Sequence, residues 1–202
     1  MRQQISRKAS VLAEAVIAMN DRSDVFCSLP KVPASLSDDP VHFLMAEHDR
    51  HRKVCALLSR ATRDETLTPA MLGDVSRFFG EELARHHALE MGVVFPLIRQ
   101  RVSDDESLFA KLGRIGQIQR YALRCGELIQ RQMTEGSGLN TSALQDRFKE
   151  RIQTYTRNQF SALTYENAVI LRIAEAVLRK GDLRRISDRI KEGYGLERHH
   201  GP

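Results

Sequence analysis

The chain has 202 residues and a formal net charge of +5 at pH 7, and 42% of its residues are hydrophobic and 28% charged. This composition is typical of one folded domain with extensions and excludes an intrinsically disordered chain. No apolar run approaches the roughly 18 residues of a membrane span, so we expect no transmembrane segment and a cytoplasmic protein. The basic excess is small and dispersed, which argues against a nucleic-acid partner.

An N-terminal extension, residues 1–37, precedes the first strong helical pattern. It starts with basic residues and an apolar stretch, Val11 to Ile17, that Glu14 interrupts. No clear small-residue cleavage site follows, so the pattern favours a short amphipathic helix over a signal peptide. We expect its apolar stripe to fold back on the rest of the protein, although a homodimer or a docked protein partner would also cover it.

Four long segments follow, each with apolar residues at steps of three and four, which predicts amphipathic helices rather than strands. Polar clusters with proline, glycine and serine separate the segments. The four stripes run from Val41 to Leu58, from Leu72 to Leu97, from Leu108 to Met133 and from Phe148 to Val177. Four such helices joined by short loops predict an all-α, antiparallel four-helix bundle over residues 38–180.

Helix-start signals agree with this division. The candidate caps are Asp38 and Asp39 before Pro40, Thr68 before Pro69, Ser103 and Ser142. A fifth, short and basic helix is predicted over Asp182 to Glu192, within a basic C-terminal tail of residues 181–202.

Three cysteines, Cys27, Cys55 and Cys125, lie far apart and form no CxxC pair. An odd number at these spacings fits neither a disulfide framework nor a thiolate zinc site. The pattern favours a reducing compartment.

Polar residues interrupt the apolar stripes. His86 and Glu90 are four residues apart, so they project from one helix face a turn apart and can reach one metal ion. His48 lies in the middle of the first stripe and Glu166 in the middle of the fourth, which allows all four to converge at the centre of the bundle. Two carboxylates buried together are costly unless they are protonated, paired with a cation or bound to metal.

The other histidines are predicted to play lesser roles. His51, one turn along the first helix, is a candidate for an outer contact, and His87, about 100° off its stripe, flanks the site. We expect His42, His199 and His200 to be exposed or to lie in the tail.

Three stretches, FLMAEHDRHRKVCALL, LARHHALEMGVVFPLI and SALTYENAVILRIAEAVL, resemble the hemerythrin-like, HHE cation-binding domain family. The family motif has a histidine on the first helix, HxxxE before an apolar FP on the second, a histidine on the third, and HxxxE before NAVIL on the fourth. The resemblance covers about residues 38–180. It implies a bundle in which two carboxylates bridge two irons.

Two histidines of that motif are absent. Alignment of the apolar stripes pairs His48 with Gln119, and Ala162 stands where the fourth-helix histidine is expected. The resemblance implies that the retained residues are the full protein ligand set of one iron: His48, His86, Glu90 and Glu166. The second iron has lost both of its histidines.

Two interpretations remain open. In the first, the chain binds one metal ion, used for iron handling or for sensing O2, NO or redox state. Two nitrogens and two carboxylates suit Fe(II), Mn(II) and Zn(II) about equally, so the preference for one iron ion comes from the resemblance alone. Gln119 would add a weak carbonyl oxygen, and Gln159 would reach the vacated position.

In the second interpretation, the chain has lost the metal and serves as a regulatory or interaction module. One carboxylate of Glu90 and Glu166 would then be protonated, or an arginine such as Arg52 or Arg120 would hold both. No phosphate loop, activated nucleophile or cofactor fingerprint occurs in the sequence, so we do not predict an enzyme.

Overall fold

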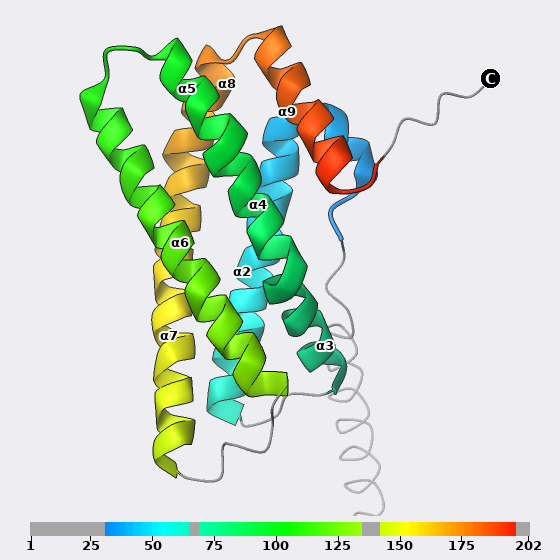
Figure 1. Cartoon of the computed structure of the whole chain (residues 1–202), viewed down its shortest axis with the longest axis vertical. Helices are drawn as coiled ribbons and strands as arrows, with labels where there is room; N and C mark the ends of the chain where they lie inside the picture. The colour runs from blue at the N-terminus through cyan, green and yellow to red at the C-terminus, as the bar shows by residue number, and fades with distance from the viewer. Residues whose placement is uncertain (1–30, 65–68, 135–141, 197–202) are drawn as a thin grey trace, which may run out of the picture.

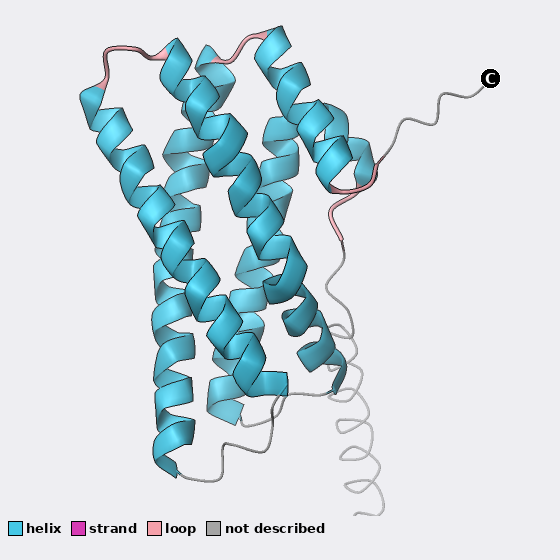
Figure 2. Ribbon diagram, viewed as in Figure 1, coloured by secondary structure: helices cyan, strands magenta, loops and turns pink. Residues whose placement is uncertain are grey.

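The computed structural model describes residues 31–64, 69–134 and 142–196. These residues are helical between short turns, and no strand occurs among them (Figures 1 and 2). The expected N-terminal helix, Cys27, Thr68, His199 and His200 lie outside the described residues.

Four helical rods form the bundle (Figure 1). The first is α2 (Pro40–Asp64); the second runs through α3 (Pro69–Arg77), η3 (Phe78–Glu82), α4 (Leu83–Leu89), η4 (Glu90–Val94) and α5 (Phe95–Arg101); the third is α6 (Glu106–Thr134); the fourth runs through α7 (Ser142–Tyr165), η5 (Glu166–Ile170) and α8 (Leu171–Val177). The predicted all-α four-helix bundle is confirmed.

Side-chain caps fix two of the helix starts. The Asp39 carboxylate accepts the backbone N–H of His42 at 3.3 Å, as the sequence predicts for the start of α2. The third rod starts later than expected, so Asp105 takes the capping role predicted for Ser103, and its carboxylate accepts the backbone N–H of Leu108 at 2.8 Å.

Two apolar clusters fill the bundle, one at each end. One is built around residues such as Phe43, Phe95, Ile98, Ile170 and Leu171. The other is built around Leu57, Leu58, Phe79, Ile129 and Tyr155. Each fully buried leucine, isoleucine or phenylalanine contributes about 1.5–3 kcal/mol. Most buried polar residues of the four rods, among them His48, His86 and Gln119, lie between the two clusters along each rod, so apolar packing at both ends holds a polar layer in place.

Gly126 allows a close approach between the second and third rods. A Cβ at this position would lie 2.6 Å from Cδ1 of Phe79, which is too close for any side chain. The missing side chain therefore lets α6 pack directly against η3.

The C-terminal helix α9 (Lys180–Gly193) packs on η2 (Ala34–Asp38), α2 and α4 (Figure 1). Ile186 and Ile190 are buried in the first apolar cluster. Arg101 of α5 donates to both carboxylate oxygens of Asp182 at 2.8 Å, and the same carboxylate accepts the backbone N–H of Arg179 at 2.9 Å. The predicted basic helix is thus fastened to the bundle, while the predicted division of the chain at residue 180 stays a prediction.

Within the described ranges, no helix combines the length and the apolar character that a membrane crossing needs.

Candidate metal centre

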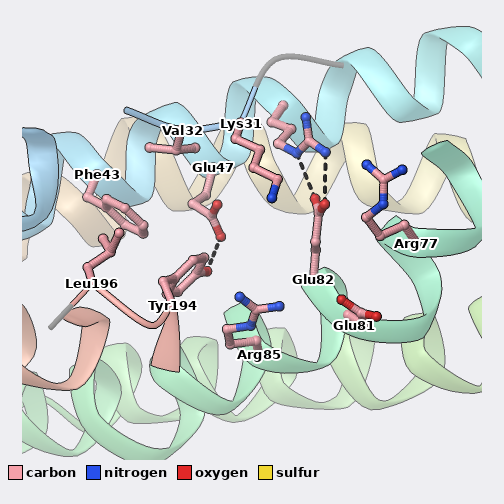
Figure 3. Close-up of a pocket in the computed structure, with 11 residues that line it drawn as sticks. Lys31, Val32, Phe43, Glu47, Arg77, Glu81, Glu82, Arg85, Tyr194 and Leu196 are labelled. Carbon is pink, nitrogen blue, oxygen red and sulfur yellow. Dashed lines mark hydrogen bonds and ion pairs between the residues drawn. The ribbon is translucent and has the colours of Figure 1, made fainter. Parts of the chain in front are cut away.

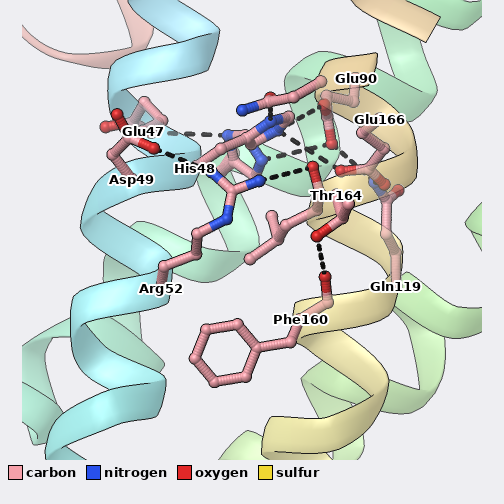
Figure 4. A network of polar contacts seen from close by, with 12 residues as sticks. Glu47, His48, Asp49, Arg52, Glu90, Gln119, Phe160, Thr164 and Glu166 are labelled. Atoms are coloured by element: carbon pink, nitrogen blue, oxygen red, sulfur yellow. Dashed lines mark hydrogen bonds and ion pairs between the residues drawn. The ribbon is translucent and has the colours of Figure 1, made fainter. Parts of the chain in front are cut away.

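The structure brings the four candidate ligands together in the polar layer. His48 comes from α2, His86 from α4, Glu90 from η4 and Glu166 from η5 (Figure 4). All four are buried, with exposed fractions of 5% or less. The spacing of His86 and Glu90 works as predicted, because the Nε2 atom of His86 lies 3.3 Å from a carboxylate oxygen of Glu90.

The donor atoms lie at the mutual distances expected of metal ligands. His48 Nε2 is 3.1 Å from Glu90 Oε1 and 3.4 Å from Glu166 Oε2. Ligands bound about 2.0–2.2 Å from one ion lie roughly 3.0–3.5 Å apart in octahedral or tetrahedral geometry. Among the described residues, His48, His86 and Glu90 are the one group of three or more potential ligands whose donor atoms lie within 4.8 Å of one another. These three residues therefore fit a metal ion, and Glu166 stands outside the group, with one oxygen 3.4 Å from His48 Nε2.

Both glutamates open a widened helical turn. The carbonyl of Glu90 accepts the N–H of Phe95, and the carbonyl of Glu166 accepts the N–H of Leu171, which are five-residue rather than four-residue steps. Such π-helical turns are rare and are frequently found at functional sites. Each adds one residue to a turn of its rod and so changes which side chains face the bundle after the glutamate.

The neighbours of the two histidines fix their orientations. Nδ1 of His48 is hydrogen-bonded to Oδ1 of Asn167, an acceptor, so Nδ1 carries a proton, while Nε2 faces the carboxylates and is hydrogen-bonded to Glu90 Oε1 at 3.1 Å. Nδ1 of His86 lies 3.6 Å from Oε2 of Glu47, and neither ring nitrogen of His86 has a hydrogen-bond partner. Buried imidazole nitrogens without partners are groups that a metal ion and an ordered acceptor would satisfy.

Gln119 takes part in the site with its amino group. Nε2 of Gln119 donates to Glu90 Oε2 at 2.6 Å and to Glu166 Oε1 at 3.3 Å, while its buried Oε1 has no hydrogen-bond partner. The sequence interpretation expected the carbonyl oxygen to face a metal. The Gln119 side chain instead turns its amino group toward the two carboxylates, because an N–H group can donate to them and a carbonyl oxygen would repel them.

The carboxylates and histidines strongly perturb one another. Burial alone would raise the pKa of Glu90, but the charge of His86 and the hydrogen bond from His48 hold it well below the usual range. Burial and the Glu90 charge raise the pKa of Glu166 to about 7. Burial would lower the pKa of His86, but Glu90 and Glu47 raise it well above the usual value. The cluster therefore holds protons near neutral pH that a cation would displace.

His51 and His87 form a second buried layer beside the candidate ligands. His51 Nε2 is hydrogen-bonded to the Tyr155 hydroxyl at 2.7 Å. Burial, with the nearby His87, lowers the pKa of His51 well below its usual value; burial and the His86 charge lower that of His87 to about 3. Both imidazoles are neutral at neutral pH, and His87 is buried rather than merely flanking.

No hydrogen bond or ion pair to the four candidate ligands is seen for the other residues named from the sequence and described in the structure. Gln159 is buried, and its Nε2 has no hydrogen-bond partner. Ala162 is buried, so no histidine faces the bundle there. Arg52 donates instead to Asp49 and to the Leu163 carbonyl, each at 2.8 Å (Figure 4).

Two connected hollows lead toward His86. The outer pocket, about 200 Å³, is lined by basic and acidic side chains of the face shown in Figure 3. A deeper cavity of about 10 Å³ borders His86 and His51 and shares Glu47, Arg50 and Glu82 with the outer pocket. A volume of that order holds about one water molecule. Arg50 and Glu82, which line both hollows, are paired: the Arg50 guanidinium donates to both Glu82 oxygens at 2.6 and 2.9 Å.

Three further residues contact the site and were not predicted from the sequence. Glu47 directly precedes His48, and Asn167 directly follows Glu166. Adjacency to a candidate ligand is therefore the signal in the sequence that points to both residues. Tyr194, which donates a hydrogen bond to Glu47, carries no such signal, because it lies beyond the predicted bundle.

Comparison with known families matches residues 39–152 to the hemerythrin HHE cation-binding domain. The matched stretch includes His48, His86 and Glu90 and ends before Glu166. Comparisons with curated proteins and with solved structures give no match. The family match spans more than half of the chain. The matched stretch contains the first three rods of the bundle and the inward residues His48, His86 and Glu90. The chain therefore belongs to the hemerythrin HHE cation-binding domain family.

Proposed function

We propose that the protein binds one divalent metal ion between His48, His86, Glu90 and Glu166, and uses it for iron handling or for sensing O2, NO or redox state. The observation that carries this proposal is the convergence of two imidazole Nε2 atoms, of His48 and His86, on the buried Glu90 carboxylate at 3.1 and 3.3 Å. The Glu166 carboxylate lies 3.4 Å from His48 Nε2. The preference for iron over Mn(II) or Zn(II) rests on family membership, because the ligand types suit all three.

The residues around the site support a single ion. His48 and His86 offer one nitrogen each, whereas Gln119 and Ala162 offer no imidazole on the opposite side. Four protein ligands on iron leave positions for a diatomic molecule or water. Reversible O2 carriage in the family draws electrons from two irons, so we do not assign it to a single-ion site.

The test is the metal content of the purified protein. We expect about one equivalent in the wild type after growth with iron, and loss of most of it in His86→Ala and Glu90→Ala. Elemental analysis with an absorption spectrum measures this, and His42→Ala, an exposed histidine of α2, is the matched control. Metal content unchanged by the two substitutions would rule the proposal out.

A metal-free regulatory or interaction module is the second candidate. It is favoured by the amide of Gln119, which donates to both carboxylates, and by the raised pKa of Glu166, which lets one carboxylate keep its proton. A purified protein without metal, whose melting temperature ignores added Fe(II), Mn(II) and Zn(II), would establish this alternative over the first.

The proposed setting is a reducing, cytoplasmic one. Cys55 and Cys125 are free and buried, and burial raises the pKa of the Cys55 thiol to about 12. A protonated, buried thiol is a poor nucleophile and a poor metal ligand. A protein partner or a second copy of the chain also belongs to the proposal, with the N-terminal apolar stripe as its candidate surface.

A further inference from the structure

Tyr194 connects the C-terminal helix to the candidate metal centre. It directly follows α9 and lies 42 residues beyond the end of the matched family domain at residue 152. Its hydroxyl donates a hydrogen bond to Oε2 of Glu47 (Figure 3). The same oxygen lies 3.6 Å from Nδ1 of His86. Tyr194, Glu47 and the candidate ligand His86 thus form a chain of polar contacts.

Three contacts hold the Tyr194 side chain in this position. Its ring packs edge-on against Phe43, with ring centroids 5.0 Å apart. The Arg85 guanidinium lies over the same ring, 4.6 Å from its centroid. The backbone N–H of Tyr194 donates to the Ile190 carbonyl at 2.9 Å, which continues the last turn of α9. The hydroxyl is therefore placed by the docking of α9 on the bundle.

Glu47 stands where an outer partner of His86 is needed. An imidazole that binds a metal through Nε2 carries its proton on Nδ1, and that proton requires an acceptor. For His48 the acceptor is Asn167, whereas His86 Nδ1 has no hydrogen-bond partner and faces Glu47. Glu47 is itself only 9% exposed, and the Tyr194 hydroxyl donates a hydrogen bond to its carboxylate.

We propose that Glu47 orients His86 for metal binding and that Tyr194 orients Glu47, so that the C-terminal helix contributes to metal affinity. Both are positioning residues, because neither touches the metal position. This inference rests on the proposed metal-binding function. Coupling between two binding events is reciprocal, so metal binding also strengthens the docking of α9.

The test uses the full chain and Co(II), whose visible spectrum and paramagnetic shifts report on its ligands. The variants are Glu47→Gln, Tyr194→Phe and the double variant. Loss of an outer partner of a ligating histidine typically costs about 10–100-fold in metal affinity. We expect Glu47→Gln to weaken Co(II) binding by about tenfold. Tyr194→Phe weakens it less, and the double variant matches Glu47→Gln because Tyr194 acts through Glu47.

A spectroscopic readout separates positioning from general destabilisation. In the Co(II) protein, the exchangeable Nδ1–H protons of His48 and His86 give separate shifted proton NMR signals. The substitutions should move or broaden the His86 signal and leave that of His48 in place. Tyr121→Phe and Glu192→Gln, two exposed positions, are the matched controls.

The outcomes distinguish the two proposals. A wild-type protein that binds no Co(II) overturns the metal-binding function and this inference with it. Wild-type binding with equal affinities and an unmoved His86 signal in Tyr194→Phe overturns the inference alone. If Glu47→Gln fails to fold by circular dichroism, Tyr194→Phe decides, because it removes one hydroxyl and keeps the packed ring.

Discussion

Gln119 and Ala162 stand where the proposed one-ion centre differs most from a two-ion one. The Gln119 amide donates to both carboxylates. It thus occupies the side from which a second cation would bind them. Ala162 is buried on α7, one turn before Glu166. The centre is therefore asymmetric, with imidazoles on the α2 and α4 side and an amide and a methyl group on the other.

Restoring both histidines should restore a second ion. In the double variant Gln119→His with Ala162→His, we expect metal content to rise from about one to about two equivalents, because each new imidazole adds a nitrogen ligand. The larger side chain at residue 162 should lower the stability of the metal-free protein by about 1–3 kcal/mol through overpacking. Elemental analysis checks the first effect and urea unfolding the second. Gln119→His alone should stay near one equivalent, and a double variant that also stays there would contradict the prediction.

Helical period predicted the central residues of the site but not their partners. His48, His86, Glu90 and Glu166 lie on apolar stripes, so a pattern of threes and fours places them inward. Asn167 and Glu47 lie beside those stripes, and rotamers rather than period decide that they contact imidazoles. The direction in which Gln119 points follows from the charges it meets, which sequence position alone does not give.

At the scale of elements, α9 is held by a small set of polar contacts in addition to its buried isoleucines. The Asp182 carboxylate serves twice, as partner of Arg101 and as acceptor for the backbone N–H of Arg179, the N-cap residue of the helix. The hydrogen bond from Arg101 lowers the pKa of Asp182 to about 2. Because the folded-state pKa lies below the unfolded value, the ionised carboxylate stabilises the fold at neutral pH, and this contribution is lost on acidification.

Asp182→Asn should therefore destabilise the protein in a pH-dependent way. At neutral pH we expect a melting temperature lower by roughly 2–4 °C, the effect of losing a helix cap in a chain of this size. The difference from wild type should shrink as the pH falls from 3.8 to about 2, where the wild-type carboxyl is also protonated. Thermal unfolding across this pH range measures it.

Glu192→Gln removes an exposed ion pair of the same helix and is the control, with little expected change at any pH. A wild-type advantage that persists in full at pH 2 would contradict the assigned role of Asp182.

Element existence followed from the sequence, whereas element detail did not. The periodic stripes gave five helices close to their observed bounds, including α9, predicted from Asp182 and starting at Lys180. The π-helical turns at Glu90 and Glu166 leave no mark on a pattern of threes and fours, because one extra residue shifts the stripe by only part of a turn. The packing of α9 on α2 and α4 was also not predictable, since it depends on Tyr194 and Asp182 contacts far apart in sequence.

At the scale of the whole molecule, a polar layer lies between two apolar clusters of one bundle. A ligand that binds only the folded state stabilises it through mass action, and at a hundredfold excess over its Kd the gain is about 2.7 kcal/mol. In a protein of this size that gain corresponds to a rise in melting temperature of roughly 5–10 °C.

We expect such a rise on addition of Fe(II) or Co(II) under anaerobic conditions, with reversal by a chelator. Differential scanning calorimetry measures it. Because the rise requires the centre, His86→Ala should abolish it, whereas the exposed His42→Ala should keep it. An equal rise in both variants would place the stabilising ion elsewhere on the chain.

The π-helical turns at Glu90 and Glu166 also make the backbone itself a reporter of the centre. Their wider hydrogen bonds join Phe95 to Glu90 and Leu171 to Glu166, and such turns open more readily than a regular helix. Amide protons in these turns should therefore exchange with deuterium through local opening, while those in the middle of α6 exchange only through global unfolding. An ion held by both glutamates would link the two turns, so the exchange of their amide protons would slow more on metal binding than exchange elsewhere. Hydrogen exchange of the unlabelled protein would then report metal occupancy at individual residues.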